Sequence, residues 1–374
     1  MILTKENISS INTDQLLDEK IKASKFGEFL LVVPTNRKLR TLKKRIVSKA
    51  PNQTLTKINI ETFGTLTQKL LQNIKPFHEL SDEAATVFIE QSVKSVPLIY
   101  LNNYDGNIPT GTLSKIKNVI SKYKEEGITH ELLMKESETL LRSEKNKAID
   151  IANIYKVYHE KCRELNSFEI GDIYSELLKV DKNDFQLNFE KLYPSVDLIV
   201  FDGFDSFSSL ELSLLNKLTL IKDTPLFLNF DYYSYNSILF SHLEETYNKL
   251  QHFGFKKIED AFEINPNKFI EIVRKRLFLK TANNLEERFK NNIVKLTAPS
   301  REKEVQAIAK EIKTLLLSGE AEPHEISVTF NLINNYSPLI RDAFTSYGIP
   351  FNLTDRLKLD NSLSVVAILS FLEI

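Results

Sequence analysis

Short runs of apolar residues that do not alternate with polar ones recur along this chain. Residues 29–33, 198–201 and 226–230 form three such runs, and each is followed by a polar residue or a proline. Continuous apolar runs of this length are typical of strands buried on both faces of a parallel sheet. Leucines at helical spacing, such as Leu210 and Leu214, follow the second run after a polar loop. The pattern therefore predicts an α/β fold with a mainly parallel sheet.

The middle of the chain shows helical spacing without strand-like runs. We therefore expect a helical insertion at 76–185, between two parts of one sheet domain at 1–75 and 186–290. Residues 291–374 are expected to begin a second α/β domain, with strands at 293–296 and 325–330 and helices at 301–317 and 337–347. The sequence stops at 371–374 inside an apolar predicted helix, which predicts that it is a fragment.

The composition narrows the classes of protein. The chain has 49 basic and 50 acidic residues and a net charge of -1, so a nucleic-acid surface has to be a local patch. Cys162 is the single cysteine, which excludes an intramolecular disulfide and a cysteine-rich metal site and fits a reducing compartment. No apolar run approaches the ~20 residues of a membrane span. The N-terminus lacks the features of a signal peptide, so we expect a cytoplasmic protein.

The strongest charge asymmetry lies between Glu28 and Glu61, where no acidic residue occurs. The eight basic residues of this stretch are Arg37, Lys38, Arg40, Lys43, Lys44, Arg45, Lys49 and Lys57. Most of them lie on a predicted helix after the strand at 29–33, and its first turn at 35–38 is expected at the carboxyl edge of the sheet. The residues of this turn are Thr35, Asn36, Arg37 and Lys38. A basic helix at this edge can bind nucleic-acid phosphates, and a solvated helix face is the alternative.

A third strand, predicted at 57–60, leads to Thr62, Phe63 and Thr65 at the same edge. Hydroxyl side chains can donate to phosphate oxygens, and an exposed aromatic ring can stack on a base. These three residues therefore join the predicted DNA-binding surface.

Three further groups of residues could contact DNA or a metal ion, but a structural role or a solvated surface is favoured for them. The tyrosines at 232, 233 and 235 suit a stacking platform, but packing against a neighbouring helix is favoured. Lysines in the insertion can face DNA, although a solvated helix face is favoured for them; they are Lys115, Lys117, Lys122 and Lys124. His159 and Cys162 share a helix face, but two ligands make no metal site, so none is expected.

An acidic residue, Asp202, ends the strand at 198–201. An acid at this position commonly holds Mg²⁺ that is bound to nucleotide phosphates, and the alternative is a structural carboxylate that caps the next helix. A phosphate-binding loop would sit in the segment 4–12. That segment contains no glycine and no G-x-x-x-x-G-K-[ST], so the usual phosphate cradle is missing.

Four segments in order resemble UvrD/RecB-type superfamily 1 helicases. Residues 31–38 resemble motif Ia, 60–66 motif Ib and 200–211 motif II, and 302–350 resemble the start of the second motor domain. The resemblance extends to the helicase-like N-terminal half of AddB/RexB-type subunits of bacterial helicase-nucleases, where motif II similarly reads Asp-Gly-Phe. It implies a RecA-like 1A-type domain for the sheet, a 1B-type insertion and the start of a 2A-type domain.

The sequence departs from this family pattern at the residues of ATP hydrolysis. Asp202 is followed by Gly203 where active members have glutamate, and neither Asn331 nor Leu332 is the arginine of motif IV. Because phosphoryl transfer depends on charges placed around the γ-phosphate, the resemblance implies an inactive motor. The degenerate motif II also includes Glu211 and Asp205, which is an alternative to the missing carboxylate.

These patterns predict an ATPase-inactive, helicase-like part of a helicase-nuclease subunit. We expect it to bind single-stranded DNA and a partner subunit in double-strand-break repair, with no cofactor and no catalytic residue of its own. The resemblance implies that a nuclease domain follows in the full-length protein. Two alternatives remain: an active helicase or NTPase with an atypical nucleotide loop at 4–13, and a protein-interaction scaffold that does not contact DNA.

Overall fold

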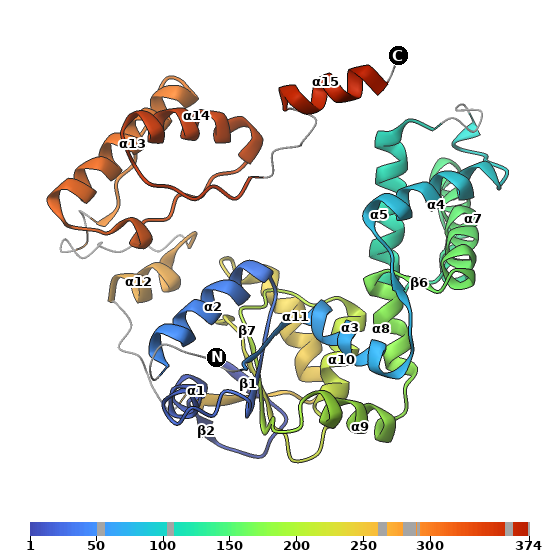
Figure 1. Ribbon diagram of the computed structural model, residues 1–374, viewed down its shortest axis with the longest axis horizontal. Coiled ribbons are helices and arrows are strands. Elements are labelled where there is room, and N and C mark those ends of the chain that lie inside the picture. Colours follow the sequence, from blue (N-terminus) through green and yellow to red (C-terminus); the bar gives the residue numbers. More distant parts are fainter. Residues whose placement is uncertain are drawn as a thin grey trace. The chain divides into compact units, whose positions relative to one another are not determined.

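The computed structural model describes residues 1–50, 57–102, 108–260, 268–279, 289, 292–355 and 362–372. The chain forms two compact units, Met1–Thr281 and Ala282–Ile374 (Figure 1). The first unit contains a seven-stranded sheet and a group of inserted helices. Mixed α/β structure with a mainly parallel sheet confirms the predicted fold class.

The seven strands follow the order β2-β9-β1-β8-β7-β3-β4. Their bounds are β1 Ile2–Thr4, β2 Ser10–Ile11, β3 Phe29–Val33, β4 Asn59–Thr62, β7 Leu198–Asp202, β8 Leu226–Asn229 and β9 Lys256–Asp260. Four of them, β4, β3, β7 and β8, run parallel to one another and end at one edge, which we call the carboxyl edge. All five residues of β3 are buried, as its uninterrupted apolar sequence predicts.

The first strand runs against the parallel strands of the sheet. β1 pairs antiparallel with both β8 and β9, so the residues after Thr4 lie at the edge opposite to the carboxyl edge. The chain then returns through β2, which runs parallel to β9 and leads into the helix α1, Thr13–Lys22. The segment 4–12, where a phosphate-binding loop would sit, therefore contains a strand, and the start of α1 reaches the carboxyl edge.

Helices cover both faces of this sheet, because alternate strand residues point to opposite sides. On one face α1 and α2, Asn36–Lys49, pack through Ile21 and Ile46 on β3 and β7. The other face packs against α3 Phe63–Ile74, α8 Ile170–Lys179, α9 Lys182–Leu192, α10 Ser209–Leu218 and α11 Ser241–His252. Helix α12, Lys268–Arg276, follows β9 in the chain.

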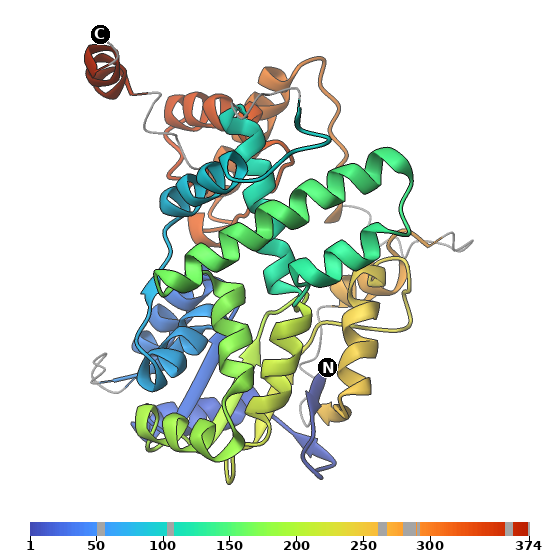
Figure 2. The ribbon, with the colours of Figure 1, turned by 90° about the vertical axis from the view of Figure 1, so that its right-hand side faces the viewer.

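Within the segment predicted as a helical insertion, 76–185, four helices form a group with a core of its own, and the rest of the segment packs in the sheet core. The group comprises α4 Asp82–Lys94, α5 Thr110–Glu125, α6 His130–Ser137 and α7 Arg142–Glu164. Figure 2 shows this group, in teal and green, extending beyond the sheet. A short parallel pair, β5 His78–Glu79 and β6 Ser167–Phe168, joins the two ends of the group. Past β6 the chain returns to the sheet through α8, whose Ile173 and Leu177 lie in the sheet core.

The second unit contains the two predicted helices, as α13 Arg301–Ser318 and α14 Ile333–Ser346, packed through Val305 and Ile340. A 3-10 turn, Pro323–Glu325, and α15, Leu363–Leu372, complete its regular elements among the described residues. The strands predicted at 293–296 and 325–330 are wrong: the described residues there pair with no neighbouring strand. A strand needs such a neighbour for its backbone hydrogen bonds, and the second-domain assignment stays a prediction.

The crossing of α5 and α8 depends on Gly171. A Cβ atom at this position would lie 2.6 Å from the Lys124 carbonyl carbon and 2.7 Å from the Glu125 nitrogen. We predict that Gly171→Ala lowers the free energy of unfolding by about 1–3 kcal/mol, because the two helix backbones must move apart. Gly27→Ala is the matched control, since nothing lies within 4 Å of its added Cβ. Urea unfolding of both variants measures the difference, and equal stabilities would contradict this account of the crossing.

Candidate nucleic-acid interface

The carboxyl edge gathers three of the segments singled out in the sequence. β3 leads into the first turn of α2, β4 into α3, and β7 into the motif II segment. Because β7 lies between β8 and β3, the start of α2 is next to the end of β7. The segments that resemble motifs Ia, Ib and II are therefore neighbours in space.

An ion pair joins two of these segments. The Lys38 Nζ atom lies 2.7 Å from Asp202 Oδ2, and about a third of each side chain is exposed. Gly203 makes this contact possible: its φ is +82°, and a Cβ at this position would lie 1.9 Å from Lys38 Nζ. A side chain at 203 and the Lys38 ammonium therefore compete for the same space.

Further hydrogen bonds continue from Asp202 to α1. Asn229 at the end of β8 directs its Nδ2 atom to Asp202 Oδ1 at 3.5 Å, and the Thr13 hydroxyl donates to Asn229 Oδ1 at 3.1 Å. Thr13 is the first residue of α1, which Asn12 caps by accepting from the Gln15 N–H. Sequence reasoning missed Asn229 because the apolar run was predicted to extend through Phe230, which hid the polar strand end.

The first turn of α2 presents polar and basic groups outward. The Thr35 hydroxyl caps the helix by accepting from the Lys38 N–H at 3.2 Å. Asn36, Arg37 and Arg40 are exposed, and neither arginine forms an ion pair with another described residue. A helix N-terminus with exposed guanidinium groups attracts anions, because backbone N–H dipoles and side-chain charges have the same sign there.

The start of α3 is more closed than the sequence suggested. Phe63 is buried at 3% exposure and packs edge-on against Phe201, so the prediction of an exposed stacking ring is wrong. The ring is buried because the phenylalanines that follow β7 complete an aromatic cluster around it. Thr62 and Thr65 form a reciprocal cap at the helix start, and Thr65 also donates to Glu61. DNA contact by these two threonines stays a prediction.

The rest of the motif II segment has a structural use. The Glu211 carboxylate accepts from the Ser208 N–H and from the Tyr174 hydroxyl at 3.1 Å, and burial raises its pKa. The rings of Phe204 and Phe207 stack with centroids 4.8 Å apart. Asp205 is exposed. This segment therefore anchors α10.

The tyrosines after β8 mostly pack, as favoured. Tyr232 stacks on Tyr247 with centroids 4.6 Å apart, and Tyr233 packs against Phe240. Tyr235 retains 46% exposure.

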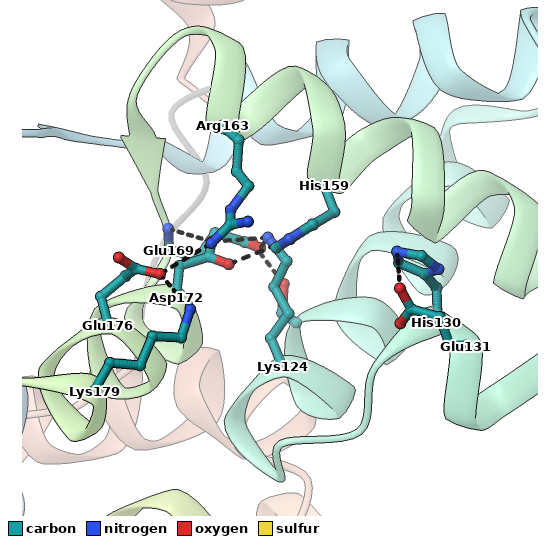
Figure 3. A network of polar contacts seen from close by, with 10 residues as sticks. Lys124, His130, Glu131, His159, Arg163, Glu169, Asp172, Glu176 and Lys179 are labelled. Carbon is teal, nitrogen blue, oxygen red and sulfur yellow. Dashed lines mark hydrogen bonds and ion pairs between the residues drawn. The ribbon is translucent and has the colours of Figure 1, made fainter.

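A buried polar network joins the helical insertion to the sheet domain (Figure 3). Lys124 of α5, with a side chain 2% exposed, lies 2.8 Å from Asp172 and 2.9 Å from Glu169 at the start of α8. Its burial alone would lower the pKa of Lys124, but the two carboxylates outweigh burial and raise it. Glu126 adds a second link by accepting from the Ser209 N–H at 2.9 Å.

For two of the four insertion lysines, both the expected DNA contact and the expected solvated face are wrong. Lys117 and Lys124 face neither DNA nor water, since they are 6% and 3% exposed and pair with Asp82 and Asp172. Sequence periodicity misses such residues, because a buried lysine depends on carboxylates from distant segments.

His159 and Cys162 share a cavity of about 280 Å³ with His130 and Arg163. Within the described ranges no group of three or more His, Cys, Asp or Glu side chains is placed to hold a metal ion. No helix in the described part of the chain is long and apolar enough to span a membrane.

A family model, the UvrD/REP helicase N-terminal domain, matches residues 4–231, which is more than half of the sequence. The chain belongs to the UvrD/REP helicase family.

Within this family, curated relatives support an AddB-type helicase-like region. The chain is 25% identical over 289 residues to the B subunit of the ATP-dependent helicase/deoxyribonuclease of Clostridium botulinum (strain Langeland), covering 71% of this chain and 24% of that protein. The protein of the same name from Listeria monocytogenes is 28% identical over 262 residues, covering 64% and 21%. That of Clostridium tetani is 22% identical over 392 residues, covering 96% and 32%. The chain thus spans between a fifth and a third of these relatives, and the predicted resemblance is confirmed.

The family implies a Mg²⁺-nucleotide at the carboxyl edge, and the residues present do not fit one. A phosphate loop needs glycine N–H groups and a lysine, but α1 begins with Asn12 and Thr13 after a segment without glycine. The Asp202 carboxylate already contacts an ammonium group, and Gly203 supplies no second carboxylate. The phosphate-loop motif and the motif II glutamate of this family are therefore absent from these two segments.

The junction network generates a pH prediction. His159 Nδ1 lies 3.7 Å from Asp172 Oδ1, and burial lowers the pKa of His159 with help from Lys124, Arg163 and His130, although Asp172 opposes this. The unfolded chain therefore takes up a proton near pH 6.5 that the folded chain binds only at lower pH, so stability falls as the pH drops below about 6.5.

Between pH 6.5 and 5, His159 is expected to reduce the free energy of unfolding by up to about 1.4 kcal/mol per pH unit. We predict that His159→Gln removes this pH-dependent loss. The exposed His252, changed to Gln, is the control. Urea midpoints measured across this range test the prediction, and parallel pH profiles for wild type and His159→Gln would contradict it.

Proposed function

We propose that this chain is the DNA-binding, ATP-independent helicase-like region of a helicase–deoxyribonuclease subunit. One observation carries the proposal: α2 turns Lys38 inward to the motif II carboxylate and leaves Arg37 and Arg40 exposed at the same edge. The charges needed for nucleotide chemistry are thus used within the protein, and the charges suited to phosphate binding face outward.

The proposed ligand is the backbone of single-stranded DNA. Arginines and a helix N-terminus bind phosphate oxygens without regard to sequence. Thr35 and Asn36 add hydrogen-bonding groups beside Arg37. Membership of a helicase family supports a single strand as the ligand.

The names of the relatives support a partner. Each is called the B subunit of an ATP-dependent helicase/deoxyribonuclease, which is the basis for proposing a second, catalytic subunit. In this proposal the chain holds DNA for that subunit during double-strand-break repair in the cytoplasm. The assignment of 1–75 and 186–290, 76–185 and 291–374 to 1A-type, 1B-type and 2A-type domains belongs to the same proposal.

Fluorescence anisotropy of a labelled oligothymidylate, titrated at several salt concentrations, tests DNA binding. We predict that DNA binding weakens as the salt concentration rises. In the double variant Arg37→Ala with Arg40→Ala, the slope of log K against log salt is expected to be shallower by about 1.4, because each phosphate contact on a single strand contributes ~0.7. The control is Lys303→Ala with Lys310→Ala, which removes two exposed charges from α13.

The same titrations are repeated with ATP and Mg²⁺. We predict unchanged affinity and no release of phosphate, because the carboxyl edge lacks a phosphate cradle. Absence of binding at low salt, or equal slopes for the two double variants, contradicts the proposed surface. A nucleotide effect contradicts the proposed independence from ATP.

A further inference from the structure

The polar groups at the carboxyl edge have the composition of a site for a hard cation. The Asp202 carboxylate accepts from Asn229 Nδ2 at 3.5 Å, and Asn229 Oδ1 accepts from the Thr13 hydroxyl at 3.1 Å, so carboxylate, amide and hydroxyl groups are neighbours here. Hard divalent cations prefer such oxygen ligands. In P-loop NTPases a hydroxyl residue of the phosphate loop and a strand-end aspartate hold Mg²⁺, and Thr13 and Asp202 occupy a helix start and a strand end in this protein.

The Asp202 carboxylate already contacts a cation of the protein itself. Lys38 Nζ lies 2.7 Å from Asp202 Oδ2. The first turn of α2 places the lysine there, and the Thr35 cap fixes that turn. The bare backbone of Gly203 completes the pocket for the ammonium, because a Cβ would lie 1.9 Å from Nζ and 2.9 Å from Cε.

We propose that the Lys38 ammonium is a built-in replacement for the divalent cation of this edge. It neutralises Asp202 and joins α2 to β7 without metal or nucleotide. The adjacent Arg37 is thereby held at the DNA-facing surface in every state of the protein. This inference rests on the proposed function only in its premise that the edge uses no nucleotide.

The proposal distinguishes Lys38 from the other basic residues of α2. Removing its charge leaves Asp202 uncompensated beside Asn229 and Thr13, which creates a weak site for a divalent ion. Removing the charge of the exposed Lys43 leaves the edge as it is.

The experiment measures Mn²⁺ binding, from the loss of the free-ion electron paramagnetic resonance signal, and melting temperature with and without Mn²⁺ at constant ionic strength. Wild type is expected to show no saturable Mn²⁺ site. Lys38→Ala is expected to gain one, with a rise in melting temperature of about 2–4 °C at tenfold excess over its dissociation constant. Adding Asp202→Asn to this variant abolishes both effects, and Lys43→Ala behaves as wild type.

Several results would overturn the inference. Saturable Mn²⁺ binding to wild type that Asp202→Asn removes means that Lys38 does not exclude the ion. A folded Lys38→Ala variant without an Mn²⁺ site means that the contact is an ordinary ion pair. If Lys38→Ala does not fold, Lys38→Gln is used in its place. The wild-type Mn²⁺ titration needs no variant of Lys38.

These results are independent of the DNA titrations. If the protein does not bind DNA but gives the expected Mn²⁺ results, only the proposed function is contradicted. If it binds DNA as predicted but the Mn²⁺ results differ from those expected, only this inference is contradicted.

Discussion

The contact between Lys38 and Asp202 determines how the carboxyl edge is built. It joins the first turn of α2 to the end of β7 at 2.7 Å, and the positive φ of Gly203 leaves room for the ammonium. Ion pairs with this exposure contribute only about 0–1 kcal/mol to stability. The Lys38–Asp202 pair matters for where it places side chains. Lys38 contacts the motif II carboxylate, while the preceding residue, Arg37, faces solvent.

Two buried clusters link segments of the first unit that are distant in sequence. Phe63, Phe201 and Phe204 pack together beneath the carboxyl edge, so the starts of α3 and of the motif II segment form one aromatic layer. Further along, Lys124 and its two carboxylates connect the insertion to α8 in the sheet core. A buried lysine with two partners ties α5 firmly in place, because separating the groups would leave charges buried and unpaired.

The sequence predicted the parts of the fold that depend on local pattern. Strands β3, β7 and β8, the helical insertion and helices α13 and α14 followed from apolar runs and spacing, because burial sets that spacing directly. The antiparallel direction of β1, the burial of Phe63 and the inward lysines did not follow, since each depends on a partner far away in sequence. The ion pair at Asp202 was missed for the same reason: 164 residues separate it from Lys38, which the sequence pattern had assigned to DNA.

We propose that the carboxyl edge of this helicase fold binds single-stranded DNA and does not bind nucleotide. Hydrogen–deuterium exchange tests it most directly, because one experiment reports on both ligands. We expect single-stranded DNA to slow amide exchange in residues 35–45 and to leave α13 unchanged. We expect ATP with Mg²⁺ to leave exchange unchanged at 12–16 and at 200–206. Slower exchange in those two segments with ATP, or no protection of α2 by DNA, would contradict it.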